Sequence, residues 1–546
     1  MDTAHTKAGI AEAQTKGIAS TPSQITSHPL IAILGVFIGA LTSIFTGRLL
    51  GVGLADVQGA IEASSDAMSW VSTSFNAAMM FSGPLTVFLG GLFGYRRVLL
   101  WASVVFMLSE FLSPLVAHDI RALIVMQFIA GFSSGTYYPL TMTLVIKDLP
   151  LKYVQLGIAV YALDILGSTH ITTLIEAWFM NHLSWQWIFW SALISTPVLM
   201  ACIYYGVPRQ PLPERGPRTN LWGFLYASTG LTLLFCGLDQ GERLDWFNSG
   251  VIIAFFVTGV FMIAVSIVRH MRQPNPLINM SFLASRNFLL LGLVLTSFRF
   301  LLLAPTLLLP KYLALLHGYR PDQTGGVLAW TAIPELIAAP VAGYFLYKAD
   351  SRLICSIGFM LVGLTCFANS RLDPGWTGET FVATQVVNAI GLAFALTGLV
   401  TTIIRSGLAA GALKSPFNML TLSCWCHTCR LFGGELGKAV MQRFLVVQGT
   451  LHYTILAQHL DGGWLTEERL RLLISNLFSA GAGLDDARAR AIIELGSSAK
   501  QQIGLLAISD GFVLVTLCAA FCLLILALHA YTPPLPRIVP AKQGAA

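Results

Sequence analysis

The sequence has few charged residues for its length. Only 11% of its 546 residues are Asp, Glu, Lys or Arg, against about 25% in ordinary soluble domains. Hydrophobic residues make up 55%, and the mean hydropathy is +0.70. These values exclude a soluble globular protein. The apolar runs are continuous rather than alternating, so they also exclude a membrane β-barrel.

Several signatures of other classes are missing. The chain has no phosphate-binding G-x-x-x-x-G-K-[ST] loop and no H-E-x-x-H pattern, so neither ATP-driven export nor enzymatic activity is supported. The net charge of +6 is spread along the loops, which argues against a nucleic-acid partner. The run Cys424-Trp-Cys426-His427-Thr-Cys429 spreads its side chains around a helix, so we expect packed thiols there and no metal site.

Long apolar stretches dominate what is present. Each is near twenty residues, which is enough to cross the roughly 30 Å hydrocarbon core of a bilayer as a helix. The fold class we expect is therefore an all-α polytopic membrane protein with fourteen spans. These begin near residues 30, 68, 96, 121, 154, 186, 220, 250, 287, 324, 353, 378, 415 and 506.

Charge in the short connections predicts the orientation. Basic residues gather in alternate connections, as in Arg96-Arg97, whereas the other connections hold acidic clusters such as 239–245. Positive charge marks the cytoplasmic side, so both termini are expected in the cytoplasm. Residues 1–28 are polar and lack a secretory signal, which predicts a disordered tail.

One connection is long, from about residue 448 to 502, and carries amphipathic pieces at 465–478 and 485–495. Such a loop is uncommon unless it is functional. We expect it on the outer side. A helical cap over the outer mouth is the favoured interpretation, and a docking surface for a partner is the alternative.

Five segments, in order, resemble the fourteen-span drug:proton antiporters of the major facilitator superfamily. They are HLSWQWIFW (182–190), GLDQGERLDWFNSG (237–250), RHMRQPNPLINMSFLASRNF (269–288), GYRPDQTGGVLAWTAIP (318–334) and RLFGGELGKAV (430–440).

The resemblance implies two six-helix halves that rock around a central cavity. We expect these halves at 29–208 and 273–532, two extra helices at 209–272, and a second tail at 533–546. It also implies a bacterial inner-membrane location, a small-molecule substrate, surrounding lipid, no cofactor and a proton gradient as energy source. By family analogy, a periplasmic adaptor and an outer-membrane channel could dock at the long outer loop.

The chain also departs from that family. It keeps Gly94, Arg96 and Arg97 of the conformational loop after span two, but the buried Arg of span four is replaced by Gln127. Motifs of spans one and five are altered as well. Residues for proton coupling must therefore be sought in this chain itself.

Ionisable residues within the spans are the candidates, because charge at the centre of a bilayer is costly and usually functional. Arg299 lies about 18 Å into span nine, and Glu335 in span ten is at a matching depth. An Arg299–Glu335 pair between adjacent helices is therefore possible, either as a static contact or as part of a substrate or proton site. Pro334 and Pro340 around the carboxylate predict a bent helix.

Span five adds three ionisable residues six positions apart, Asp164, His170 and Glu176. They point in different directions on a straight helix. Asp164 is the deepest and is the favoured proton carrier, since desolvation favours the protonated form of a carboxylate. His170 is a second candidate, and Glu176 is expected near the outer interface.

Two further arginines complete the charged set. Arg430 matches a family position in span thirteen, whereas Arg48, toward the outer end of span one, is either functional or extends to the interface. Aromatic and polar residues expected to line the cavity are Gln127, Tyr137, Tyr138, Phe298 and Trp330. Glu435 and Lys438 are expected to neutralise one another on one helix face.

The sequence thus predicts a secondary transporter that exports apolar or amphipathic, drug-like compounds in exchange for protons. A dedicated exporter of one metabolite or lipid is the first alternative. A membrane scaffold or sensor that transports nothing is the second.

Overall fold

A computed structural model describes residues 28–147, 151–208, 221–272, 283–411, 416–460, 463–481 and 483–529. The two predicted tails fall almost entirely outside these ranges. Within them the chain forms helices and connections, with no strand. The all-α prediction is confirmed.

Membrane-length helices follow the predicted path. Eleven helices in the described part are long and apolar enough to cross a bilayer, and α8 (Leu151–His182) counts as a twelfth despite a 47° bend between Ser168 and His170. Two further predicted spans coincide with α6 (Ile120–Ser134) together with α7 (Tyr137–Lys147), and with the 45-residue α20 (Pro416–Leu460), so the described helices are consistent with fourteen spans.

The first helices pack on one another and form an N-terminal group. Within it α4 packs on α6, α2 on α8 and α10, and α5 on α6 and α10. In addition to α6, α7 and α8, its members are α2 (Pro29–Val52), α3 (Leu54–Ile61), α4 (Ser65–Phe93), α5 (Tyr95–Val116), α9 (Trp187–Trp190) and α10 (Ala192–Gly206).

Two extra helices follow, α11 (Leu221–Gly241) and α12 (Gly250–Met271), joined by the short turn η1 (Trp246–Asn248). They pack closely because Gly230 and Gly259 face one another. A Cβ on Gly230 would lie 2.8 Å from the Gly259 carbonyl oxygen. α11 also lies against α4 and α20, whereas α12 is on the outside, with only 17% of its apolar window buried in the protein. α12 therefore offers most of its surface to lipid.

The remaining helices form a C-terminal group, in which α18 packs on α19 and α22, and α14 on α20 and α22. α19 is the most enclosed span, with 83% of its window buried. In addition to α20, the members are α14 (Arg286–Leu301), the π-helical η2 (Ala304–Leu308), α15 (Leu309–His317), α16 (Pro321–Ala329), α17 (Ala332–Phe345), α18 (Ser351–Asn369), α19 (Val382–Ala409), α21 (Trp464–Ser479) and α22 (Leu484–Leu528).

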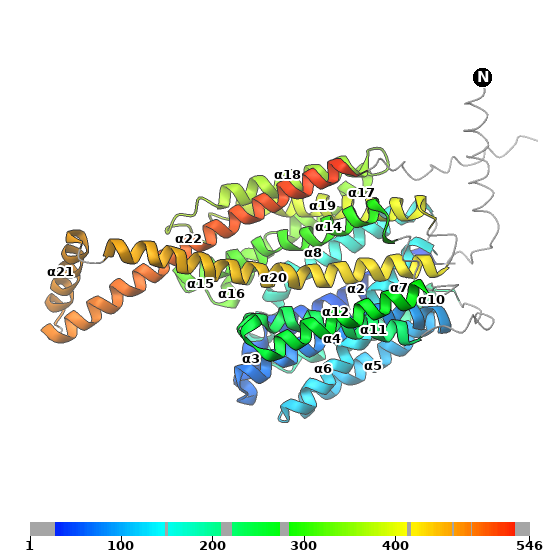
Figure 1. Ribbon diagram of the computed structural model, residues 1–546, viewed down its shortest axis with the longest axis horizontal. Helices are drawn as coiled ribbons and strands as arrows, with labels where there is room; N and C mark the ends of the chain where they lie inside the picture. Colours follow the sequence, from blue (N-terminus) through cyan, green and yellow to red (C-terminus); the bar gives the residue numbers. More distant parts are fainter. Residues whose placement is uncertain are drawn as a thin grey trace, which may run out of the picture.

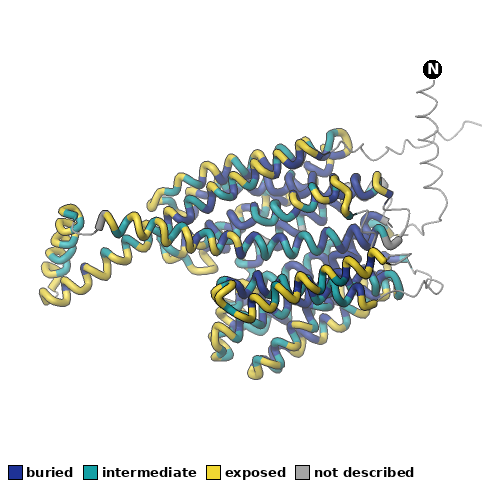
Figure 2. The backbone as a smooth tube through the Cα atoms, in the orientation of Figure 1, coloured by how far each residue is buried: buried dark blue, intermediate teal, exposed yellow. Residues whose placement is uncertain are grey.

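The two groups meet along two lines. α8 lies against α16, α17 and α19, and α20 lies against α4 and α7. Helices α16 and α8 approach each other closely at Gly325 of α16, since a Cβ there would lie 3.0 Å from the backbone nitrogen of Leu174 in α8. Figure 2 shows buried residues through the middle of the bundle and exposed residues on its outer helices. The core is thus shared between the groups.

The long connection is helical and projects from the bundle. α20 and α22 both continue past the other helices, and α21 joins their far ends and packs on α22 (Figure 1). The structure thus replaces the expected cap with a helical hairpin that leads away from the bundle. We call the end of the bundle that carries it the hairpin end. The cap prediction was wrong because the piece at 485–495 extends the spanning helix α22, and the piece at 465–478 forms α21, which packs on α22 instead of on the bundle.

Candidate functional site

One buried ion pair joins the two groups. His170 of α8 and Glu335 of α17 are fully buried, and the imidazole Nδ1 lies 3.0 and 3.1 Å from the two carboxylate oxygens. The predicted Arg299–Glu335 pair is therefore wrong. Glu335 is paired from the N-terminal group, because α17 packs on α8 and α19 while α14 packs on α20 and α22.

Both partners sit at irregularities of their helices. His170 directly follows the bend of α8, where the Thr172 hydroxyl donates to the carbonyl of Ser168. Such bonds to the preceding turn often bend helices. Glu335 lies in the first turn of α17, just after a break between Ala329 and Ala332 and next to Pro334. The helix is thus interrupted just before this carboxylate, while the predicted bend at Pro334 and Pro340 stays a prediction.

A second set of residues gathers three arginines, of which Arg430 is buried and Arg48 and Arg299 are half-buried. Arg48 comes from α2, Arg299 from α14 and Arg430 from α20, and their charges are close enough to act on one another. Among the described side chains, none of the three forms an ion pair. Two nitrogens of Arg299 and two of Arg430 are buried without a hydrogen-bond partner. Positive charge that is largely withdrawn from the surface is thus concentrated where the groups meet.

Tyr138 of α7 lies at the centre of this set. The guanidinium carbon of Arg430 is 4.2 Å from the centre of its ring, a cation–π distance. The rings of Tyr161 and His427 lie 4.8 and 5.4 Å from it. His427 in turn contacts the Met79 carbonyl at 3.2 Å. Residues of both groups therefore surround one aromatic ring.

Three other predicted cavity residues lie within a single group. Gln127 donates to the Ser113 hydroxyl at 2.9 Å, and Tyr137 packs edge-on against Phe106 at 5.8 Å, so both hold α6 and α7 against α5. Phe298 is fully buried and packs against a ring of α18 at 6.5 Å. The structure places these side chains in the packing of the bundle, away from the interface of the groups.

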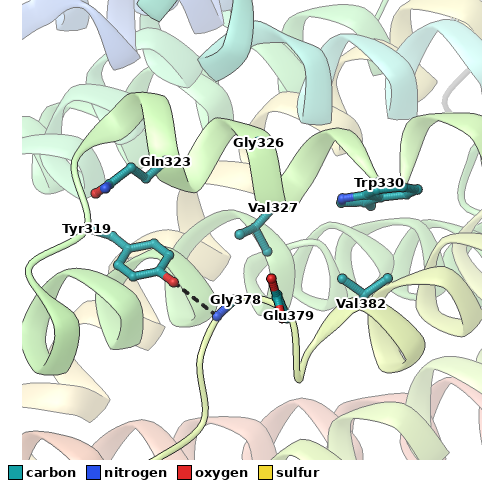
Figure 3. Close-up of a pocket in the computed structure, with 8 residues that line it drawn as sticks. All are labelled: Tyr319, Gln323, Gly326, Val327, Trp330, Gly378, Glu379 and Val382. Atoms are coloured by element: carbon teal, nitrogen blue, oxygen red, sulfur yellow. Dashed lines mark hydrogen bonds between the residues drawn. The ribbon is translucent and has the colours of Figure 1, made fainter.

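Trp330 lines a pocket of a different kind. It is 56% exposed and borders a cavity of about 310 Å³ near the hairpin end. Figure 3 shows the two sides of this pocket, with the Gly378 backbone N–H donating to the Tyr319 hydroxyl at 3.4 Å. All of the residues that line this pocket belong to the C-terminal group, so the pocket does not lie between the two groups. The lining residues are Tyr319, Gln323, Gly326, Val327, Trp330, Gly378, Glu379 and Val382.

The loop after α4 has a conformation that requires glycine. Gly94 has φ 78° and ends α4 as it begins α5, a region that other residues rarely adopt. Arg96 follows, donates to the Tyr204 carbonyl at 2.7 Å and stacks on the Tyr204 ring at 5.2 Å. Arg97 is exposed. This loop ties α5 to the end of α10, opposite the hairpin end.

Two other predictions concern charge. The Asp164 side chain lies outside the described residues, so the structure does not place it. The Glu435–Lys438 contact is confirmed at 3.3 Å, and the Lys438 ammonium also lies 2.7 Å from Asp239 of α11. In the described part of the chain, no three His, Cys, Asp or Glu side chains are placed to hold a metal ion.

Sequence reasoning missed Tyr161 and His427 as members of the central set. His427 and Arg430 are three residues apart, the spacing that puts two side chains on one helix face. That signal was available but was obscured by the cysteines on either side of His427. Tyr161 had no comparable signal, since its role follows from the packing of α7 on α8.

Two helix groups that share a charged site at their interface are the arrangement expected of a multi-pass membrane transporter. The family model of the Major Facilitator Superfamily matches residues 36–420, and the chain belongs to that superfamily.

Curated relatives and solved structures agree with this assignment. The chain is 24% identical to the "Multidrug export protein EmrB" of Haemophilus influenzae, over 79% of this chain and 83% of that protein. It is 26% identical to the "Fatty acid resistance protein FarB" of Neisseria gonorrhoeae, over 78% and 82%. The human transporter MFSD10 (TETRAN) matches with a TM-score of 0.52 at 14% identity, covering 92% of this chain and all of that one. That likeness shows the fold alone.

Proposed function

We propose that this transporter exports apolar or amphipathic compounds across the bacterial inner membrane, with both termini in the cytoplasm, in exchange for protons. The observation that carries the proposal is the His170–Glu335 pair, fully buried between the two groups. The names of the relatives, which include multidrug export and fatty acid resistance proteins, are consistent with export.

The pair can couple protons to movement because its contact depends on its protonation state. A carboxylate attracts a protonated imidazole, whereas a protonated carboxyl group is neutral and can only share a hydrogen bond with it. Protonation of Glu335 from the outside would weaken the contact between α8 and α17. Release of the proton to the inside would restore it. Asp164, which the sequence favours as proton carrier and which lies on the same helix as His170, is our second candidate after Glu335.

Alternating access follows from the same arrangement. The two groups meet at α8 and α20, and the arginine site takes residues from both, so a rocking motion would open that site to either side in turn. Of the two extra helices, α11 contacts both groups, through α4 and α20, whereas α12 packs on α11.

We also propose that the projecting hairpin docks an export partner in the periplasm, such as an adaptor that leads to an outer-membrane channel. The hairpin exposes large apolar side chains well beyond the bundle, and such surfaces usually mark interaction sites. These side chains are Trp464, Leu465, Leu472, Phe478 and Ile493.

Inside-out vesicles test the coupling. They are energised to acidify the lumen, and uptake of ethidium and of a series of neutral and acidic fluorescent amphiphiles is followed together with lumenal pH. We expect uptake with proton release in the wild type. Glu335→Gln should lower the initial rate of proton release at least tenfold while the protein stays folded.

Glu494→Gln, an exposed carboxylate on α22, is the matched control and should behave as wild type. Uptake with full proton release in Glu335→Gln would remove Glu335 from the coupling site. Failure of every probe to move would overturn drug export. A dedicated exporter of one metabolite or lipid, which the altered family motifs favour, would then be sought.

A further inference from the structure

The three central arginines have no described counter-charge. Charged side chains in membrane spans are normally paired, as His170 is with Glu335. Arg430 is 4% exposed, and two of its guanidinium nitrogens have no partner. Two nitrogens of Arg299 are buried in the same way. The site thus presents hydrogen-bond donors whose positive charge no described side chain neutralises.

Neighbouring residues keep the donors in place. Arg299 lies against Gly434 of α20, where an added Cβ would be 3.2 Å from Nη2 and 3.3 Å from Nε. The absence of a side chain at Gly434 leaves room for the guanidinium. The guanidinium carbon of Arg430 lies 4.2 Å from the centre of the Tyr138 ring. Arg299 and Arg430 are therefore supported by contacts within the protein.

The two helix groups share the site. Arg48 and Tyr138 belong to the N-terminal group, and Arg299 and Arg430 to the C-terminal group. A ligand that holds all three arginines would bridge the groups. Arginine fits a carboxylate with two parallel N–H···O bonds, and an aromatic ring beside it can take the adjoining apolar part of the same molecule.

We propose that Arg48, Arg299 and Arg430 bind the carboxylate headgroup of an anionic amphiphile, and that this compound class is the preferred substrate. The proposal rests on the export function given above and specifies its substrate. Bound anion would compensate the repulsion between the arginines, so occupancy would favour the arrangement in which all three converge.

Binding to the purified protein tests this without relying on transport. The probe is 11-(dansylamino)undecanoic acid, whose fluorescence rises in apolar surroundings, compared with its neutral methyl ester. We expect the acid to bind at least tenfold more tightly than the ester. Arg299→Gln and Arg430→Gln should each weaken binding of the acid about tenfold and leave binding of the ester unchanged. Arg299→Lys should lose less of its affinity for the acid than Arg299→Gln.

Arg490→Gln, an exposed arginine of the hairpin paired with Asp486, is the control and should bind as wild type. Thermal unfolding shows that each variant is folded. Equal binding of acid and ester, or full binding by folded Arg→Gln variants, would overturn the proposal and mean that the arginines are neutralised within the chain. Binding of the acid without transport in vesicles would instead count against the export function.

Discussion

At the scale of single residues, Gly131 shows how closely the spans approach. It lies in α6, where an added Cβ would be only 2.0 Å from the Phe75 carbonyl oxygen of α4. We expect Gly131→Ala to push the two helices apart and to cost about 1–3 kcal/mol of stability, or more because the obstacle is backbone. The thermal unfolding midpoint of the purified protein measures this.

Gly167 of α8 is the matched control, since an added Cβ there meets nothing within 4 Å. Gly167→Ala should leave the midpoint unchanged or raise it, because alanine favours helix by about 1 kcal/mol over glycine. If both variants melted alike, the contact of α6 with α4 would not limit stability.

Residue identity and depth could be predicted from the sequence, but partners could not. The depths of Arg299 and Glu335 match, yet their helices face different neighbours, and Glu335 contacts His170 instead. Depth follows from counting residues along a helix. Direction around the helix and the choice of neighbour depend on how all the helices pack, which a single sequence does not specify. The Glu435–Lys438 contact was predictable because both residues lie on one helix.

At the scale of elements, α21 at the tip of the hairpin can be removed without changing the bundle. α21 packs on α22 and lies beyond the other helices. Replacing residues 461–483 by about ten Gly and Ser residues, which at about 3.3 Å each can span its length, should leave the thermal midpoint and vesicle transport unchanged. Cells that express this variant should lose resistance to exported compounds, because four of the five apolar side chains of the docking surface are gone and only Ile493 is kept.

Inserting the same linker after Ser479 keeps α21 and serves as the control for added flexibility. Full resistance in cells that carry the deletion would show that the hairpin docks no required partner.

The spans and their order were predictable because apolar length alone requires them. The form of the hairpin was not. The periodicity of the amphipathic pieces at 465–478 and 485–495 predicts helices but not the surface on which they pack. It also does not predict that α22 continues without a break from Leu484 to Leu528.

At the scale of the whole molecule, movement of the two groups can be stopped by one bond. The hydroxyls of Thr143 in α7 and Ser423 in α20 are 3.0 Å apart, between groups and toward the end opposite the hairpin. Thr143→Cys with Ser423→Cys should form a disulfide under oxidation, since the side chains are already adjacent. We expect transport to fall at least tenfold and to return after reduction.

Each single-cysteine variant is the control, and mass spectrometry identifies the linked peptides against the nine native cysteines. Undiminished transport by fully cross-linked protein would mean that the two groups need not separate at this end.

The unbroken course of α22 has a mechanical consequence. Its 45 residues form one rod about 68 Å long, and the N-terminal part of that rod stands clear of the bundle (Figure 1). A tilt of the C-terminal group by about 15° would therefore move the far end sideways by about 8 Å for every ~30 Å of rod beyond the pivot. The hairpin would then transmit movement as well as provide a binding surface. A partner bound at its tip would be displaced once in each transport cycle.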